Sequence, residues 1–142
     1  MAPATIREAT PADAAFYAEL MSLLGYPASE EEARNRMHRL DRDGQRLLVA
    51  ELDGRLAGIA AMQVYPDLIH DPPTCRLVVL VVAEWARRRG VGRALTKTVE
   101  EEARSAGCGW VVLESGLRRD EAHEFYGALG YENHALEFVK QL

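Results

Sequence analysis

Cysteine is scarce in this chain of 142 residues, which has only Cys75 and Cys108. Two cysteines without metal-ligand spacing exclude a disulfide framework, and they favour a reducing compartment. The sequence also lacks an apolar run near the roughly 20 residues that a membrane span needs, and its first residues do not show a secretory pattern. We therefore expect a cytoplasmic protein that does not associate with a membrane.

Positive charge is in short supply as well, because 17 Lys and Arg stand against 22 Asp and Glu and leave a net charge of −5. This balance argues against general nucleic-acid binding. The composition, 48% hydrophobic and 27% charged, is typical of a globular protein, and the length predicts one domain over residues 1–142. Four of the arginines gather in residues 87–93. In an acidic chain, such a cluster indicates a ligand site rather than a DNA-binding surface.

Capping residues and the period of the apolar residues predict alternating helices and strands. Helices are expected to begin after Thr10 and Ser29, and Asp53-Gly54 predicts a hairpin turn between two antiparallel strands. The unbroken apolar run that ends at Val82 predicts a strand buried on both faces. The expected strands cover residues 5–7, 47–52, 56–64, 76–82, 110–113 and 135–142, and the later helices run from Gly90 to Gly107 and over 120–129.

The expected strand at 76–82 leads into a basic turn that contains glycine. Gly90 and Gly92 remove side chains where a backbone must approach a ligand closely. The first turn of the helix that follows offers N–H groups without partners, and the arginines add full positive charge. These features together predict an anion site, and a pyrophosphate fits it.

Two other nucleotide-binding motifs match this turn poorly. A phosphate-binding loop of the nucleoside triphosphatases would continue with Lys-Ser or Lys-Thr, but Gly92 is followed by Arg93-Ala94. A dinucleotide-binding fold needs a third glycine where this chain has Leu95, although Glu114 lies at a suitable distance for the acid that binds ribose. A dinucleotide-dependent oxidoreductase is therefore the weakest alternative.

Two motifs together resemble the GCN5-related N-acetyltransferase (GNAT) family. The pattern Arg-x-x-Gly-x-Gly over residues 87–92 is similar to the loop with which that family binds the pyrophosphate of acyl-CoA. The pattern Ala-x-x-Phe-Tyr-x-x-x-Gly-Tyr over 122–131 is similar to the second signature of the family, one helix and one strand downstream. The segment from Arg119 onward also resembles, in part, the aminoalkylphosphonate N-acetyltransferases.

The resemblance implies an α/β (α+β) fold. Its mixed, mainly antiparallel sheet would have six to seven strands and about four flanking helices, and it would splay open at a cofactor cleft. The implied cofactor is acetyl-CoA, no metal is required, and a homodimer remains open. The residues implied to bind the cofactor are Leu80, Val81 and Val82 on the strand, Arg87, Arg88, Arg89, Gly90, Val91, Gly92, Arg93 and Ala94 in the turn and helix start, and Tyr126.

The resemblance also implies catalytic roles. Tyr126 would donate a proton or hydrogen bond to the departing thiolate, and a backbone N–H near Val82 would stabilise the charge that develops on the thioester oxygen. Many relatives carry acids at the positions of Val78 and Val79, so the general base must come from elsewhere in this chain. Glu114 is the first candidate, and the loop residues His70 and Asp71 are the second.

The predicted reaction is acetyl transfer to a primary amine of a small molecule, by direct attack in a ternary complex. Tyr26, His70 and Asp71 are predicted to contact that amine, which is either zwitterionic or cationic. Two further functions stay open: a non-catalytic acyl-CoA sensor or partner subunit, and an acetyltransferase for peptide or protein N-termini. Arg118, Arg119 and His123 have no assigned role.

Overall fold

The computed structural model describes residues 3–40, 44–115 and 119–142, and the chain divides into two compact units. The first unit, Met1–Val112, contains all of the β-sheet, and the second, Leu113–Leu142, contains one helix. The prediction that residues 1–142 form a single domain stays a prediction.

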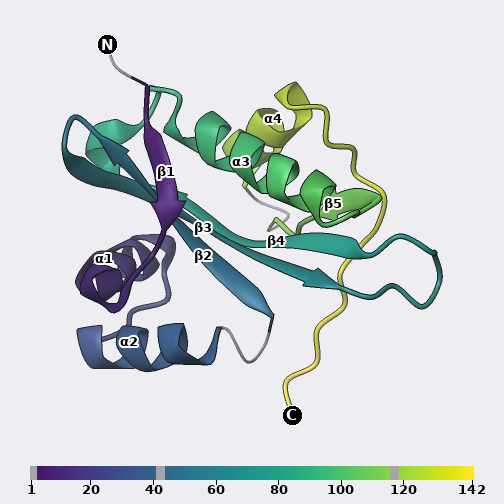
Figure 1. Ribbon diagram of the computed structural model, residues 1–142, viewed down its shortest axis with the longest axis horizontal. Coiled ribbons are helices and arrows are strands. Elements are labelled where there is room, and N and C mark those ends of the chain that lie inside the picture. Colours follow the sequence, from purple (N-terminus) through teal and green to yellow (C-terminus); the bar gives the residue numbers. More distant parts are fainter. Residues whose placement is uncertain (1–2, 41–43, 116–118) are drawn as a thin grey trace. The chain divides into compact units, whose positions relative to one another are not determined.

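The first unit is built on a sheet whose strands follow one another in chain order (Figure 1). All neighbouring strands are antiparallel except the last two, which are parallel. The hairpin predicted from Asp53-Gly54 joins the second and third strands, and Asp53 has a φ of 53° there. The strands are β1 (Thr5–Glu8), β2 (Gln45–Leu52), β3 (Arg55–Tyr65), β4 (Thr74–Val82) and β5 (Trp110–Val112).

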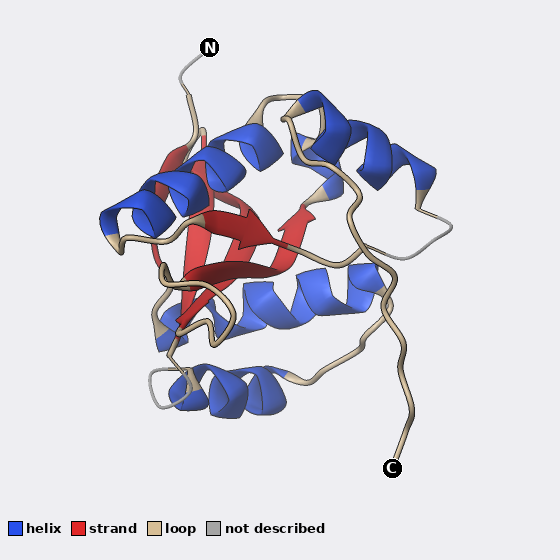
Figure 2. Ribbon diagram, turned by 90° about the vertical axis from the view of Figure 1, so that its right-hand side faces the viewer, coloured by secondary structure: helices blue, strands red, loops and turns tan. Residues whose placement is uncertain are grey.

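Helices cover both faces of this sheet (Figures 1 and 2). α1 (Ala14–Leu24) and α2 (Glu30–Arg39) lie on one side, and α3 (Val91–Ser105) lies on the other. Leu20 and Met21 of α1 pack with buried residues of β2, β3 and the end of β4 to form one hydrophobic cluster of the core. Short 3₁₀ turns, η1 (Pro11–Asp13) and η2 (Glu84–Ala86), precede α1 and follow β4.

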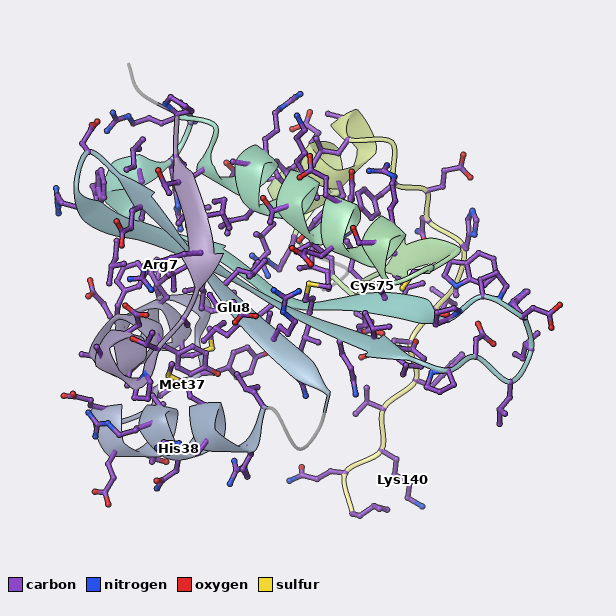
Figure 3. All side chains as sticks on the ribbon, viewed as in Figure 1. Arg7, Glu8, Met37, His38, Cys75 and Lys140 are labelled. Carbon is purple, nitrogen blue, oxygen red and sulfur yellow. The ribbon has the colours of Figure 1, made fainter. Side chains whose placement is uncertain are left out.

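The predicted capping signals are present at the helix ends. Ser29 Oγ accepts a hydrogen bond from the Glu32 N–H at 3.0 Å, and the Glu32 carboxylate accepts one from the Ser29 N–H at 3.0 Å. This pair fixes the start of α2. Met37 then packs toward α1 and the sheet, while the next residue, His38, is exposed (Figure 3). The helix ends at Arg39, and Leu40 is its C-cap.

The second unit contains α4 (Asp120–Ala128), after which residues 131–142 form no regular structure. The predicted strand over 135–142 is therefore wrong, and the described sheet has five strands rather than six to seven. Leu136, Phe138 and Val139 are 67%, 91% and 81% exposed. An apolar pattern alone does not make a strand, because a strand is stable only when a neighbour pairs with its backbone and covers its apolar face.

A charged cluster ties β1 to the turn before α1. Arg7 donates two hydrogen bonds to the Asp13 carboxylate at 2.9 and 3.0 Å, and its Nε donates to Glu51 at 2.9 Å. The Asp13 carboxylate also accepts from the Thr10 N–H at 2.8 Å. These contacts hold the pKa of the buried Asp13 below its ordinary value, with Arg7 as the largest cause.

Replacing Asp13 with Asn will lower the free energy of unfolding at pH 7 by about 1–3 kcal/mol. The expected loss lies at the lower end of the range for a buried ion pair because the Arg7 side chain is 38% exposed and water partly solvates it. A lowered pKa in the folded state stabilises the protein above the pKa of the unfolded chain, and this stabilisation is lost as the pH falls through the folded value. Urea unfolding from pH 7 to pH 2.5 will therefore show a steeper loss below pH 4 for the wild type than for Asp13→Asn. Parallel curves would contradict this role.

Candidate active site

The end of β4 and the start of α3 are joined by the basic turn predicted from the sequence. The Ala83 N–H donates to the Ala57 carbonyl at 2.8 Å, so the chain remains attached to β3 as it leaves the sheet. Arg88 has a φ of 62°, a left-handed conformation that is costly for a residue with a side chain. Gly90, with a φ of 81°, is the N-cap of α3. We refer to residues 84–90 as the arginine turn.

The first turn of α3 presents backbone N–H groups at the arginine turn. The first hydrogen bond of the helix runs from the Ala94 N–H to the Gly90 carbonyl at 3.0 Å. The N–H groups of residues 91–93 therefore have no acceptor within the helix. Gly90 places no side chain over them, and no other atom lies within 4 Å of where its Cβ would be. This arrangement suits an anion.

The four arginines of the cluster differ in their surroundings. Arg87, Arg88 and Arg93 are exposed, whereas Arg89 is half-buried and its Nη2 lies 2.7 Å from the Asp53 carboxylate. The guanidinium of Arg55 lies 4.1 Å from the centre of the Trp85 ring. Three arginines thus offer exposed positive charge, while the fourth is engaged with the β2–β3 hairpin turn.

The start of α3 lies unusually close to β3. A Cβ atom at Gly58 would lie 3.0 Å from the Val81 carbonyl oxygen, 3.1 Å from a Val91 methyl and 3.2 Å from a Leu95 methyl. Val91 and Leu95 are fully buried. Only glycine at position 58 therefore allows the helix to sit at this depth, and the depth decides where its N-terminus lies.

β4 has an unpaired edge beside this turn. It pairs with β5 only from Thr74 to Arg76 and continues to Val82 without that neighbour. Opposite β3, Ala61 pairs with Val79 and Met62 pairs with Leu77, so Val78 is the extra residue of a bulge. Val78 is 42% exposed. Among the described residues, the backbone from Leu77 to Val82 therefore has no paired strand on the β5 side of β4.

The residues predicted to contact the cofactor along β4 lie on this open segment. Val81 is 6% exposed and packs in the core, so only its backbone is available to a ligand. Leu80 and Val82 are half-buried. Amide groups along an open strand edge match the amides of a pantetheine arm, and the cationic turn beyond them matches a pyrophosphate. The residues present therefore fit coenzyme A.

The loop before β4 holds His70 and Asp71 at the other end of that strand. The Asp67 carboxylate accepts hydrogen bonds from the Ile69 N–H at 2.7 Å and from the Thr74 hydroxyl at 2.9 Å. The same carboxylate also contacts His70 Nδ1 at 3.1 Å. These partners, the Ile69 amide first, lower the pKa of Asp67 to about 2. The His70 ring also packs edge-on against Trp110, with ring centres 4.2 Å apart. The loop is therefore internally fixed.

The structure separates this loop from the arginine turn. The nine residues of β4 span roughly 26 Å at about 3.3 Å per residue. His70 and Asp71 precede the strand and the arginine turn follows it, so the two are not brought together. Asp71 instead lines a pocket of about 290 Å³ with Tyr65 and Asp67. Tyr26 is 67% exposed just after Gly25, which ends α1 with a φ of 102°.

The second unit contains the other predicted catalytic residues. Tyr126 is half-buried on α4, and its ring packs edge-on against Phe125 and Tyr131 with ring centres 5.3 and 5.8 Å away. Burial raises the pKa of Tyr126 above its ordinary value of 10, although the charge of Arg119 opposes this.

Glu114 is exposed, and the neighbouring Ser115 hydroxyl is buried without a hydrogen-bond partner among the described residues. Arg118 lies outside the described residues, and His123 is exposed.

Sequence reasoning missed Asp53, Arg55, Trp85 and Gly58 as residues that support the site. Asp53 was interpreted only as a turn former, and Gly58 lies inside an otherwise ordinary apolar strand. Asp53 and Arg89 are 36 positions apart, so no local pattern connects them. The sequence offered only two signals for this pairing, namely an acid in the hairpin turn and an unusual number of arginines in residues 87–93. Several other acids could equally well have been paired with Arg89.

Comparison with known proteins places the site in a family. The family model for GNAT acetyltransferases matches residues 14–131. The chain belongs to the GNAT family. It is therefore an acyltransferase, and GNAT enzymes generally use acetyl-CoA. The match extends from α1 through the end of α4, and so it includes the arginine turn and both predicted motifs.

Individual GNAT relatives agree with this assignment. The chain is 32% identical over 132 residues to the aminoglycoside N(6')-acetyltransferase type 1 of Stenotrophomonas maltophilia, covering 90% of this chain and 86% of that protein. It is 31% identical to the aminoalkylphosphonate N-acetyltransferase of Salmonella typhimurium, covering 63% of this chain and 58% of the relative. A solved acetyltransferase from Trypanosoma brucei matches with a TM-score of 0.84 at 26% identity, covering 99% of this chain and 100% of that one. The predicted family resemblance is thus confirmed.

The helices offer no sign of a membrane span. Over residues 3–40, 44–115 and 119–142, no helix combines the length and the apolar character needed to cross a bilayer.

Replacing Gly58 with Ala will push α3 away from β3. We expect it to lower the free energy of unfolding by about 1–3 kcal/mol, because the added methyl group meets a backbone oxygen as well as two buried side chains. It will also weaken coenzyme A binding, since the N-terminus of α3 shifts. Urea unfolding and calorimetry measure the two effects. Gly127→Ala in α4 is the control for stability, because nothing lies within 4 Å of its added Cβ; equal stability of both variants would contradict the packing argument.

Proposed function

We propose that this GNAT protein transfers the acetyl group of acetyl-CoA to a primary amine of a small molecule, by direct attack of the amine in a ternary complex. The observation that carries this proposal is the anion site at the end of β4. Exposed Arg87 and Arg88 adjoin the free N–H groups of the first turn of α3. Both features lie next to a strand edge that is open to a chain of amides.

The proposed cofactor contacts follow the order of the chain. Leu80, Val81 and Val82 contact the pantetheine arm through their backbone, and residues 87–94 hold the pyrophosphate. When bound, the acetyl thioester supplies an activated acyl carbon. A backbone N–H near Val82 donates a hydrogen bond to the carbonyl oxygen, and this stabilises the negative charge that develops there as the amine attacks.

Two residues of the second unit are proposed to move protons. The Glu114 carboxylate, directly or through a water, takes the proton that the amine nitrogen loses as the new C–N bond forms. The Tyr126 hydroxyl donates to the sulfur as the C–S bond breaks. Because the pKa of Tyr126 is raised, its hydroxyl keeps its proton throughout the neutral range. Glu114 is exposed, so a water can reach it.

The acceptor is proposed to carry more than one charged group. Relatives named for aminoglycosides and for aminoalkylphosphonates differ in the sign of the groups beside the amine. The net charge of −5 and the exposed Asp71 favour a cationic acceptor. Tyr26, His70 and Asp71 are the proposed substrate contacts. Because His70 and Asp71 lie away from the arginine turn, they suit the distal part of a long substrate rather than the reacting amine.

One observation supports a second function. The bulge at Val78 exposes a valine on β4, and the next residue is Val79, so this segment supplies no carboxylate to take a proton. A protein that binds acyl-CoA without transferring the acyl group has no need of such an acid. An acyl-CoA sensor is therefore the alternative to the enzyme.

Calorimetry with coenzyme A and acetyl-CoA, followed by thiol release across a panel of amines, will separate the two functions. The panel contains aminoglycosides, polyamines, aminoalkylphosphonates and peptides with free N-termini. We expect binding of coenzyme A and turnover with at least one small amine. Binding without turnover on any amine would indicate the sensor, turnover only with peptides would indicate an N-terminal acetyltransferase, and binding of NAD but not coenzyme A would contradict both proposals.

Replacing Tyr126 with Phe will lower kcat by about 100-fold, because general acid catalysis typically contributes about 10²–10⁴-fold. The KM for acetyl-CoA will change little. In the wild type, kcat will fall as the pH rises through the raised pKa of Tyr126, and this alkaline limb will be absent from the variant. Tyr131→Phe, which removes a hydroxyl from a ring packed on the same side chain, is the control. Full kcat with an unchanged alkaline limb in Tyr126→Phe would exclude the proton-donor role.

A further inference from the structure

Two side-chain contacts join the β2–β3 hairpin turn to the arginine turn. Asp53 Oδ2 lies 2.7 Å from Arg89 Nη2, and the Arg55 guanidinium lies 4.1 Å from the centre of the Trp85 ring. The Arg89 guanidinium lies 5.9 Å from the same ring centre. The Trp85 ring therefore lies near two cations, Arg55 and Arg89, and Arg89 is also bound to Asp53.

The arginine turn needs restraint from outside itself. Arg88 is held in the left-handed region at a φ of 62°, which costs free energy that the surroundings must offset. Four arginines within residues 87–93 also repel one another. The backbone hydrogen bonds from Ala86 N–H to the Ala83 carbonyl at 2.9 Å and from Arg87 N–H to the Glu84 carbonyl at 3.3 Å both lie before Arg88 in the chain. The contacts with Asp53 and Arg55 add restraint from outside the turn.

We propose that Asp53 is a positioning residue for cofactor binding. By holding Arg89 against the hairpin turn, Asp53 keeps the backbone on either side of Arg88 in the conformation that presents Arg87, Arg88 and the N-terminus of α3 to the pyrophosphate. The conformational entropy of the turn is then lost on folding rather than on binding, and this increases the affinity for coenzyme A. This inference rests on the proposed binding of coenzyme A.

An electrostatic role and a positioning role of Asp53 predict opposite effects of its removal on coenzyme A binding. A carboxylate close to an anion site repels the anion, so on charge alone its removal tightens coenzyme A binding. If Asp53 positions the turn, its removal weakens binding, because Arg89 loses this carboxylate contact and the turn becomes less ordered. The direction of the change therefore distinguishes the positioning role from a purely electrostatic one.

The experiment compares the Kd for coenzyme A of wild type, Asp53→Asn and Asp53→Glu by calorimetry at low and high salt. Glu30→Gln is the matched control, because Glu30 and Arg34 form an exposed ion pair of the same length, 2.7 Å, on α2. We expect Asp53→Asn to raise the Kd about three- to fivefold, in line with an exposed ion pair. Asp53→Glu will recover most of the affinity, and Glu30→Gln will match the wild type.

A second measurement follows the turn without ligand. In a Trp110→Phe background, Trp85 is the remaining tryptophan, and acrylamide quenching reports its exposure. Asp53→Asn will increase that quenching while the midpoint of urea unfolding stays close to that of its parent. Unchanged or tighter coenzyme A binding by Asp53→Asn, with unchanged quenching, would overturn the positioning role alone. Failure of the wild type to bind coenzyme A would instead overturn the proposed function and this inference with it.

Discussion

The close packing of α3 against Gly58 is the contact on which the arginine turn depends. Val91 and Leu95 are fully buried above this glycine, and the Val81 carbonyl lies beside it. The end of β4 and the first turn of α3 are therefore fixed to the same point of β3. The N–H groups of α3 therefore keep one direction, while the conformation of the turn between these two fixed ends depends on its own contacts. Close packing of the interior thus fixes the start of α3, where we propose that the anion binds.

Local signals in the sequence were sufficient to predict most of the first unit. Ser29 predicted the start of α2, and Asp53-Gly54 predicted the β2–β3 hairpin, because each of these features depends on residues that are neighbours in the chain. The basic turn before α3 was visible for the same reason, since its glycines and arginines lie within residues 87–93. Family membership followed from two short motifs that the family match includes.

Features that depend on distant residues could not be predicted in this way. The pairing of Asp53 with Arg89 arises only when the hairpin turn and the arginine turn meet in the folded sheet. The bulge at Val78 depends on the register between β3 and β4, which an unbroken run of valines does not specify. The erroneous strand over 135–142 has the same origin, because its apolar pattern was visible while its lack of a pairing partner was not.

The arginine turn balances charge against order. Each added arginine attracts a phosphate more strongly, but it also repels its neighbours and makes the turn costly to hold together. The structure divides these tasks. Arg87 and Arg88 of the turn, with Arg93 in the first turn of α3, are exposed and supply charge, whereas the charge of Arg89 is partly offset by Asp53 in a contact that adds order. A lysine at position 89 would keep the charge but lose the planar group that contacts a carboxylate and an aromatic face together. The chemical identity of Arg89 therefore matters more for the shape of the turn than for its total charge.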